Sequence, residues 1–78
     1  RNLIGDQVSV FPNPSQDQLF VSSSLNILKL EVLSETGKWI STESNNSRFV
    51  DIHNLLPGNY LLRITTAEGI GVKKFIKL

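Results

Sequence analysis

The sequence contains no cysteine and no methionine, and it has one histidine, His53. Without cysteine the chain can form neither a disulfide framework nor a thiolate metal site. A single histidine does not supply the nitrogen ligands of an ordinary zinc site. Small secreted domains often rely on disulfides, so this composition fits either a reducing compartment or a bacterial envelope protein that folds without them. The sequence therefore predicts no bound metal and no cofactor.

Long apolar segments are also missing. No apolar run approaches the roughly 20 residues that a membrane-spanning helix needs, and the first residues lack the apolar core of a signal peptide. The chain begins at Arg1 rather than Met, which we interpret as a sign that it is a piece of a longer polypeptide. The formal net charge is +1, which gives no reason to expect nucleic acid or an acidic membrane surface as a partner.

Catalytic constellations are absent from the pattern. His53 has Asp51 two residues before it, on the same face of a strand, but no serine lies in a nucleophile elbow. The acidic residues are scattered, and Gly69-Ile70-Gly71 is not followed by a helix that would bind a phosphate at its N-terminus. A domain of 78 residues also has a thin core with little room for a deep cavity. We therefore predict that the domain is not an enzyme and takes no small-molecule substrate.

The dominant sequence period is two. Apolar residues alternate with polar ones, and such alternation places successive side chains on opposite faces of a strand. Between these runs lie turn residues in the segments 12–15, 35–37, 45–47, 56–59 and 67–69. The predicted strands span residues 8–11, 18–23, 28–34, 38–43, 48–52, 59–66 and 70–77. We predict an all-β fold, a seven-stranded antiparallel immunoglobulin-like β-sandwich over residues 8–78, with residues 1–7 as the end of a linker.

In three of the turns, proline or glycine indicates the backbone conformation that we expect. Pro12 and Pro14 fix two φ angles and remove two donors, so this corner cannot lie inside a sheet. Gly37 can adopt the positive φ of a tight hairpin. Pro57-Gly58 predicts a type II turn with glycine at position i+2.

The last predicted strand has two unequal faces, and it carries three lysines within the last six residues. Strict alternation puts Val72, Lys74, Ile76 and Leu78 on one face and Gly71, Lys73, Phe75 and Lys77 on the other. Either both faces are partly covered, or one of them presents apolar side chains outward. A lysine-bearing terminal strand can be a protected sheet edge or a docking surface, and the pattern leaves both readings open.

Trp39 is the only tryptophan, and Trp39 and Ile40 cannot both face the core of a regular strand. With Ile40 inward, Trp39 lies near the surface, either half covered by neighbours or available to stack on a sugar or anchor a partner. This keeps open an alternative function: a carbohydrate- or protein-binding module of an extracellular enzyme or adhesin. An inert spacer is a further alternative.

Four segments, in their order along the chain, resemble the C-terminal sorting domain of the type IX secretion system, the Por secretion system C-terminal domain family. They are Val10-Phe11-Pro12-Asn13-Pro14 (family Y/F-P-N-P), Val32 to Ile40 with its Gly37-Lys38 turn, Ile52 to Ile64 (family L-x-x-G-x-Y-x-L-x-I), and the basic, apolar end Gly71 to Leu78. Together they span residues 10–78. Thr36 departs from the larger apolar residue that many members carry.

The resemblance implies a role as a non-catalytic signal attached to a cargo protein in Gram-negative bacteria. Such a domain folds in the periplasm and is recognised by the outer-membrane translocon. A sortase-like peptidase commonly removes it, after which the cargo stays on the cell surface or enters the extracellular medium. The implied partners are thus the fused cargo, the translocon and the peptidase.

The resemblance and the residue pattern together give candidate positions. We expect recognition by Pro12, Asn13, Pro14, Lys73, Lys74, Phe75, Ile76, Lys77 and Leu78. We expect structural roles for Gly37, Gly58 and Tyr60, with the Tyr60 hydroxyl on a backbone partner as in a tyrosine corner. The edge of the last strand can also be read by strand addition, and weak self-association through edge strands is left open.

Overall fold

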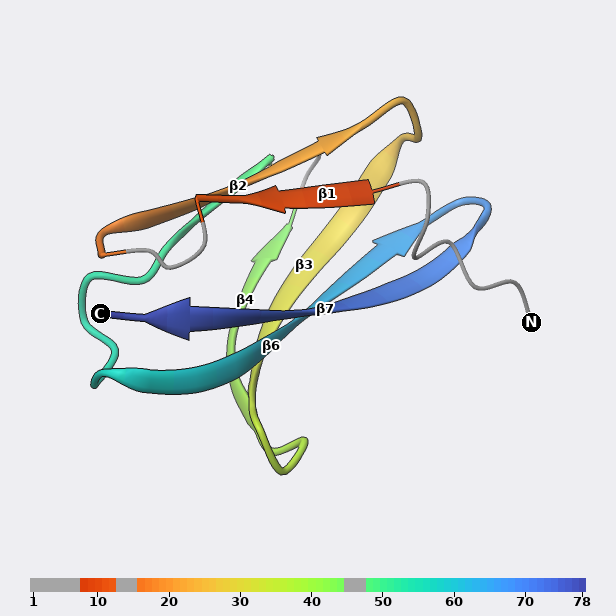
Figure 1. The fold of residues 1–78 in the computed structure, drawn as a ribbon. Helices are drawn as coiled ribbons and strands as arrows, with labels where there is room; N and C mark the ends of the chain where they lie inside the picture. The colour runs from red at the N-terminus through yellow and green to blue at the C-terminus, as the bar shows by residue number, and fades with distance from the viewer. Residues whose placement is uncertain (1–7, 13–15, 45–47) are drawn as a thin grey trace.

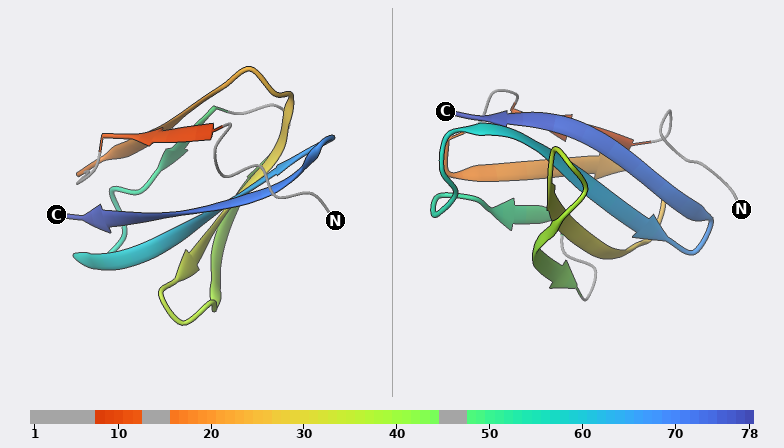
Figure 2. Two further views of the ribbon diagram at one scale, coloured as in Figure 1. Left: turned by 45° about the vertical axis from the view of Figure 1, so that its right-hand side comes forward. Right: turned by 90° about the horizontal axis from the view of Figure 1, so that it is seen from below.

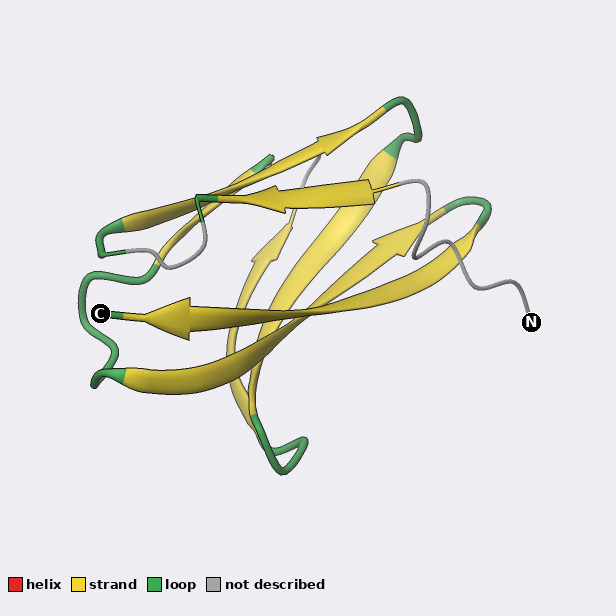
Figure 3. Cartoon of the chain, viewed as in Figure 1, coloured by secondary structure: helices red, strands yellow, loops and turns green. Residues whose placement is uncertain are grey.

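A computed structural model describes residues 8–12, 16–44 and 48–78, with the backbone alone at 42–44. The predicted linker end at 1–7, Asn13, Pro14 and the predicted loop at 45–47 lie outside the described residues. The described strands are β1 (Val8–Phe11), β2 (Gln18–Ser23), β3 (Ile27–Ser34), β4 (Trp39–Ser44), β5 (Phe49–Asp51), β6 (Gly58–Thr66) and β7 (Gly69–Lys77) (Figure 1). The described part of the chain contains no helix (Figure 3), and so none that is long and apolar enough to cross a membrane.

The strands form two antiparallel sheets. The smaller sheet has the order β1-β2-β5, and the larger has the order β4-β3-β6-β7. The two sheets lie over one another as two layers (Figure 2). The predicted all-β fold is confirmed, and each predicted strand differs from the observed one by no more than one residue at either end.

One hydrophobic core joins the two sheets. It takes inward-facing side chains from both layers, and the most deeply buried include Leu19 of β2, Val50 of β5, Leu30 of β3, Leu62 and Ile64 of β6, and Phe75 of β7. These are the apolar positions of the period-two pattern, as expected for strands with one covered face. We call the face of each sheet that points away from this core its outer face.

The start of β3 departs from strict alternation. Strict alternation along the predicted strand 28–34 would place Leu28 on the same face as Leu30 and Val32, but Leu28 is 44% exposed. The register of β3 against β6 shifts between Ile27 and Lys29, and such a bulge reverses the side-chain order locally. As a result Ile27 takes the inward place and is 1% exposed.

The hairpin between β3 and β4 has the predicted glycine turn. The Ser34 amide donates to the Lys38 carbonyl (2.7 Å), and the Gly37 amide donates to the Ser34 carbonyl (2.8 Å). Gly37 has φ +92°, the positive value that a three-residue hairpin loop requires at this position. Gly37 thus supplies the positive φ of this turn.

The predicted type II turn at Pro57-Gly58 is wrong. Gly58 has φ +154°, whereas position i+2 of a type II turn needs about +80°. Gly58 is the first residue of β6 and pairs with Lys77 of β7, so the ladder extends its backbone. The chain instead turns at residues 52–55, where the Leu55 amide donates to the Ile52 carbonyl (3.0 Å).

Candidate recognition surfaces

The loop before β6 is fixed by a tyrosine corner. The Tyr60 hydroxyl donates to the backbone carbonyl of Leu56 (2.6 Å). The Tyr60 ring stacks on Phe75 of β7, with centroids 5.7 Å apart and an interplanar angle of 23°. Tyr60 is partly buried against the core, and its hydroxyl bonds to the backbone in the manner of a tyrosine corner.

The two faces of β7 differ sharply, and of the two arrangements considered for them the structure shows the one with apolar side chains outward. Phe75 is fully buried on the inward face. The outer face presents apolar side chains to solvent, with Val72 51% exposed, Ile76 42% and Leu78 54%. Lys74, also exposed, lies among them. We call these four residues the β7 strip (Val72, Lys74, Ile76, Leu78).

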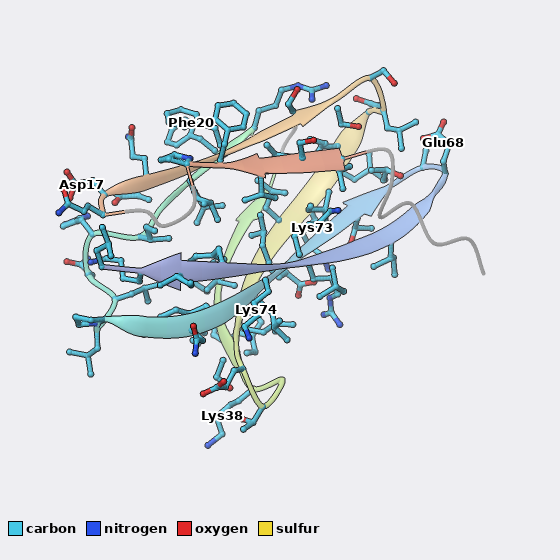
Figure 4. All side chains as sticks on the ribbon, in the orientation of Figure 1. Asp17, Phe20, Lys38, Glu68, Lys73 and Lys74 are labelled. Atoms are coloured by element: carbon cyan, nitrogen blue, oxygen red, sulfur yellow. The ribbon has the colours of Figure 1, made fainter. Side chains whose placement is uncertain are left out.

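The three lysines at the end of the chain do not form one cluster. Lys77 lies on the inward face, is 8% exposed and donates from Nζ to the Leu78 carbonyl (2.9 Å). Lys73 is half-buried on the same face, whereas Lys74 is exposed on the outer face (Figure 4). Within the predicted set at this end, Lys74, Ile76 and Leu78 are therefore the side chains that a partner reaches most readily. Their contact role stays a prediction.

The other predicted contact region is the corner after β1. Pro12 is exposed, and it follows a cis Phe11–Pro12 peptide bond. Asn13 and Pro14 lie outside the described residues. Recognition at this corner stays a prediction.

Trp39 lies on the outer face of the larger sheet. It is 57% exposed, while Ile40 packs against the core, as the sequence predicted. The register pairs Trp39 with Leu33, Leu33 with Leu61, and Leu61 with Lys74. These four residues therefore form a row across all four strands that ends in the β7 strip. Binding of a sugar by Trp39 stays a prediction.

A partly buried ion pair stabilises the same outer face. Glu31 of β3 pairs in register with Arg63 of β6. Glu31 Oε1 accepts from Nε of Arg63 (2.8 Å) and lies 2.8 Å from its Nη2. Lys29 Nζ lies 3.8 Å from the same oxygen. The Arg63 hydrogen bond lowers the pKa of the Glu31 carboxyl, and the carboxylate in turn raises the pKa of Arg63. The sequence pattern does not indicate this pair, because its partners lie 32 residues apart.

Asp51, the last residue of β5, and His53 form a local pair. Asp51 Oδ1 lies 2.6 Å from His53 Nδ1 and also accepts from the His53 amide at 3.1 Å. These hydrogen bonds lower the pKa of the Asp51 carboxyl. About half of each side chain is exposed, so the pair stabilises the turn at the surface. Among the described residues, no group of three or more His, Cys, Asp or Glu side chains gathers to hold a metal ion.

The outer face of the smaller sheet carries a feature that the sequence analysis also missed. Phe11, Phe20 and Phe49 pair in register across β1, β2 and β5. The ring centroids of Phe11 and Phe20 lie 5.9 Å apart, and those of Phe20 and Phe49 lie 6.2 Å apart. The three side chains are 49%, 38% and 45% exposed. We call them the phenylalanine row. Each follows or precedes a core residue in the alternating pattern, but only the strand register shows that they meet.

Comparison with known proteins identifies a family for this chain. No match was found among curated proteins. A family profile described as "Secretion system C-terminal sorting domain" matches residues 9–78, which include all four motif segments and every strand from β2 to β7. The chain therefore belongs to the family of type IX secretion C-terminal sorting domains.

Proposed function

We propose that this domain is a non-catalytic signal that directs the export of a fused upstream cargo, through the periplasm and across the outer membrane of a Gram-negative bacterium. Membership of the sorting-domain family supports export to the cell surface or the extracellular space. We further propose an immunoglobulin-like scaffold, which the three-plus-four strand order and the tyrosine corner at the start of β6 support.

The observation that carries the residue-level proposal is the β7 strip. Its apolar side chains are exposed on the outer face, whereas the inward face of the same strand supplies Phe75 to the core. β7 is also an edge strand of the larger sheet, and an edge strand can be extended by a strand of a partner. We propose that the outer-membrane translocon reads this edge together with the outward Lys74, Ile76 and Leu78.

We also propose that a sortase-like peptidase separates the domain from its cargo on the N-terminal side of Val8. The burial of Val8 supports this position, because Val8 is 3% exposed and is the first described residue of the core. Cleavage before it releases the cargo without cutting into the packed domain.

The experiment is export of a periplasmic fluorescent reporter fused to residues 1–78, in a host with the type IX machinery. Deleting Lys73 to Leu78 does not separate recognition from folding, because it also removes Phe75 from the core. We would instead compare wild type with the triple variant Val72→Thr, Lys74→Gln, Ile76→Thr, which keeps residues that suit a strand. Lys38→Gln, at an exposed lysine of the β3–β4 hairpin, is the matched control.

We expect the wild-type and Lys38→Gln fusions at the cell surface and the triple variant in the periplasm. If the wild-type fusion also stays in the periplasm, the sorting function of this domain is wrong. If the triple variant is exported as well as wild type, recognition through the β7 strip is wrong while the sorting function stands.

A further inference from the structure

The phenylalanine row is the largest aromatic feature on the surface of the described residues. It crosses the whole smaller sheet, one ring from each strand. Figure 4 shows Phe20 on the side of β2 that points away from the larger sheet. The inward positions of these strands are filled by Val8, Leu19, Val21 and Val50. The fold therefore has its core without these three rings, and their exposure calls for another explanation.

The residues beside the row are polar but mostly uncharged. On one side Ser9 pairs with Ser22, and on the other Gln18 pairs with Asp51. Asp51 is the only charged side chain among these four described residues, and His53 holds it by hydrogen bonds. An apolar centre with a polar rim is the usual arrangement of residues in a protein-binding surface. Since charge plays little part here, burial of apolar area has to supply the affinity.

The row is too small to hold two copies of the chain together by itself. With about 200 Å² for a phenylalanine, the exposed fractions of 49%, 38% and 45% leave about 260 Å² of ring surface accessible. Two copies packed row against row would bury about 520 Å² in total, in the range of crystal contacts and well below the ~1,200 Å² of a specific interface. The row is the size of a hot-spot cluster at the centre of a larger contact.

We infer that the phenylalanine row is an anchor by which a protein of the secretion machinery holds the domain, through a surface that presents aliphatic or aromatic side chains. This inference rests on the proposed function. Phe11 links the row to recognition, because it is the aromatic residue of the Phe11–Pro14 motif. Its side chain is half exposed and does not lie in the core. The row extends that motif across two further strands.

The anchor is separate from the β7 strip. The two lie on outer faces of different sheets, on opposite sides of the core. A flat partner cannot cover both at once, so the domain has two contacts that can be disabled one at a time.

The test uses the same reporter fusion. The variant is Phe11→Thr, Phe20→Thr, Phe49→Thr, in which a β-branched residue keeps the strand propensity. Leu28→Thr is the matched control, because Leu28 is an apolar strand residue of similar exposure (44%) on the larger sheet. Thermal unfolding followed by circular dichroism shows whether each purified domain is folded. We expect surface reporter to fall about tenfold in the row variant, as for loss of a hot spot, and to stay within about twofold in the control.

A second measurement does not depend on the folding of the triple variant. Phe20 is replaced by the photoreactive p-benzoylphenylalanine in the intact fusion, and Leu28 is replaced in a control. We expect crosslinks from position 20, and not from position 28, to an outer-membrane component of the secretion machinery. No crosslink to such a component from position 20, or equal crosslinking from both positions, overturns the anchor.

The remaining outcomes separate this inference from the proposed function. Export of a folded row variant at the wild-type level overturns the anchor and leaves the sorting function intact. Failure of the wild-type fusion to reach the surface overturns both. If sedimentation shows a wild-type dimer that the row variant does not form, the partner at the row is a second copy of the chain. If a gel containing soluble β-glucan retards the wild type but not the row variant, the partner is a polysaccharide. Either result overturns the protein anchor.

Discussion

Tyr60 and Leu56 are joined by a 2.6 Å hydrogen bond from the tyrosine hydroxyl to the leucine carbonyl, four residues earlier in the chain. The same tyrosine ring stacks on Phe75. One side chain thus connects the loop before β6 to the inward face of β7. Because the β7 strip lies on the opposite face of that strand, the tyrosine corner also holds the proposed recognition surface in place.

Replacing Tyr60 by phenylalanine tests the hydrogen bond alone. The ring and its stacking on Phe75 remain, so we expect the free energy of unfolding to fall by about 1 kcal/mol, the net value of one hydrogen bond. Urea denaturation measures this as a lower midpoint with an unchanged m-value. Tyr60→Ala, which removes the ring as well, should cost at least twice as much. Equal midpoints for wild type and Tyr60→Phe would show that the corner adds no stability.

Neighbouring residues of β7 should respond very differently to truncation. Phe75 is fully buried, so Phe75→Ala leaves a cavity and should lower the free energy of unfolding by about 3–5 kcal/mol. Ile76 is 42% exposed on the other face, and Ile76→Ala should cost about 1 kcal/mol or less. Thermal unfolding of the two variants gives the comparison. Similar losses at both positions would contradict the assignment of the two faces.

Local patterns in the sequence predicted most of the fold. Alternation marked the strands, because each strand covers one face only. The turn at Gly37 and the corner at Tyr60 were predictable since each depends on residues within a few positions along the chain. Leu28 shows the limit of this reasoning, because a bulge against β6 changes which residue points inward.

The surfaces were less predictable because they depend on strand register. Phe11, Phe20 and Phe49 come from three strands, and nothing near any one of them in the sequence indicates the other two. Lys77 illustrates a different limit. Alternation put it on the face of Phe75, but it did not show that this lysine is buried, with its ammonium group on the Leu78 carbonyl.

Gly37 should be the position of the β3–β4 hairpin that is least tolerant of a side chain. A Cβ atom there meets nothing within 4 Å, so the cost of Gly37→Ala comes from the backbone at φ +92° alone. We expect a loss of about 1 kcal/mol in the free energy of unfolding. Gly37→Asn should cost less, since asparagine tolerates positive φ better than other side chains. Equal losses for the two variants would show that the cost does not arise from the backbone angle.

The Glu31–Arg63 pair should make stability depend on pH in the acid range. The Arg63 hydrogen bond holds the pKa of folded Glu31 below its ordinary value of 4.5. A carboxyl group with a lowered folded pKa adds stability above its unfolded pKa, and this stability is lost as the pH falls through the folded pKa. The pair therefore stabilises the domain at neutral pH and ceases to do so in acid.

Glu31→Gln isolates this contribution, because Asp51, whose pKa is also lowered, is present in both proteins. At about pH 7 we expect the variant to be less stable by about 1 kcal/mol, a charged hydrogen bond reduced by the partial exposure of Arg63. The difference should shrink as the pH is lowered into the acid range below 4.5, where wild-type Glu31 becomes protonated as well. Urea midpoints at several pH values measure it. A difference that stays constant over this range would mean that glutamine disturbs the packing of β3 against β6, and that the charge of Glu31 contributes nothing to folding.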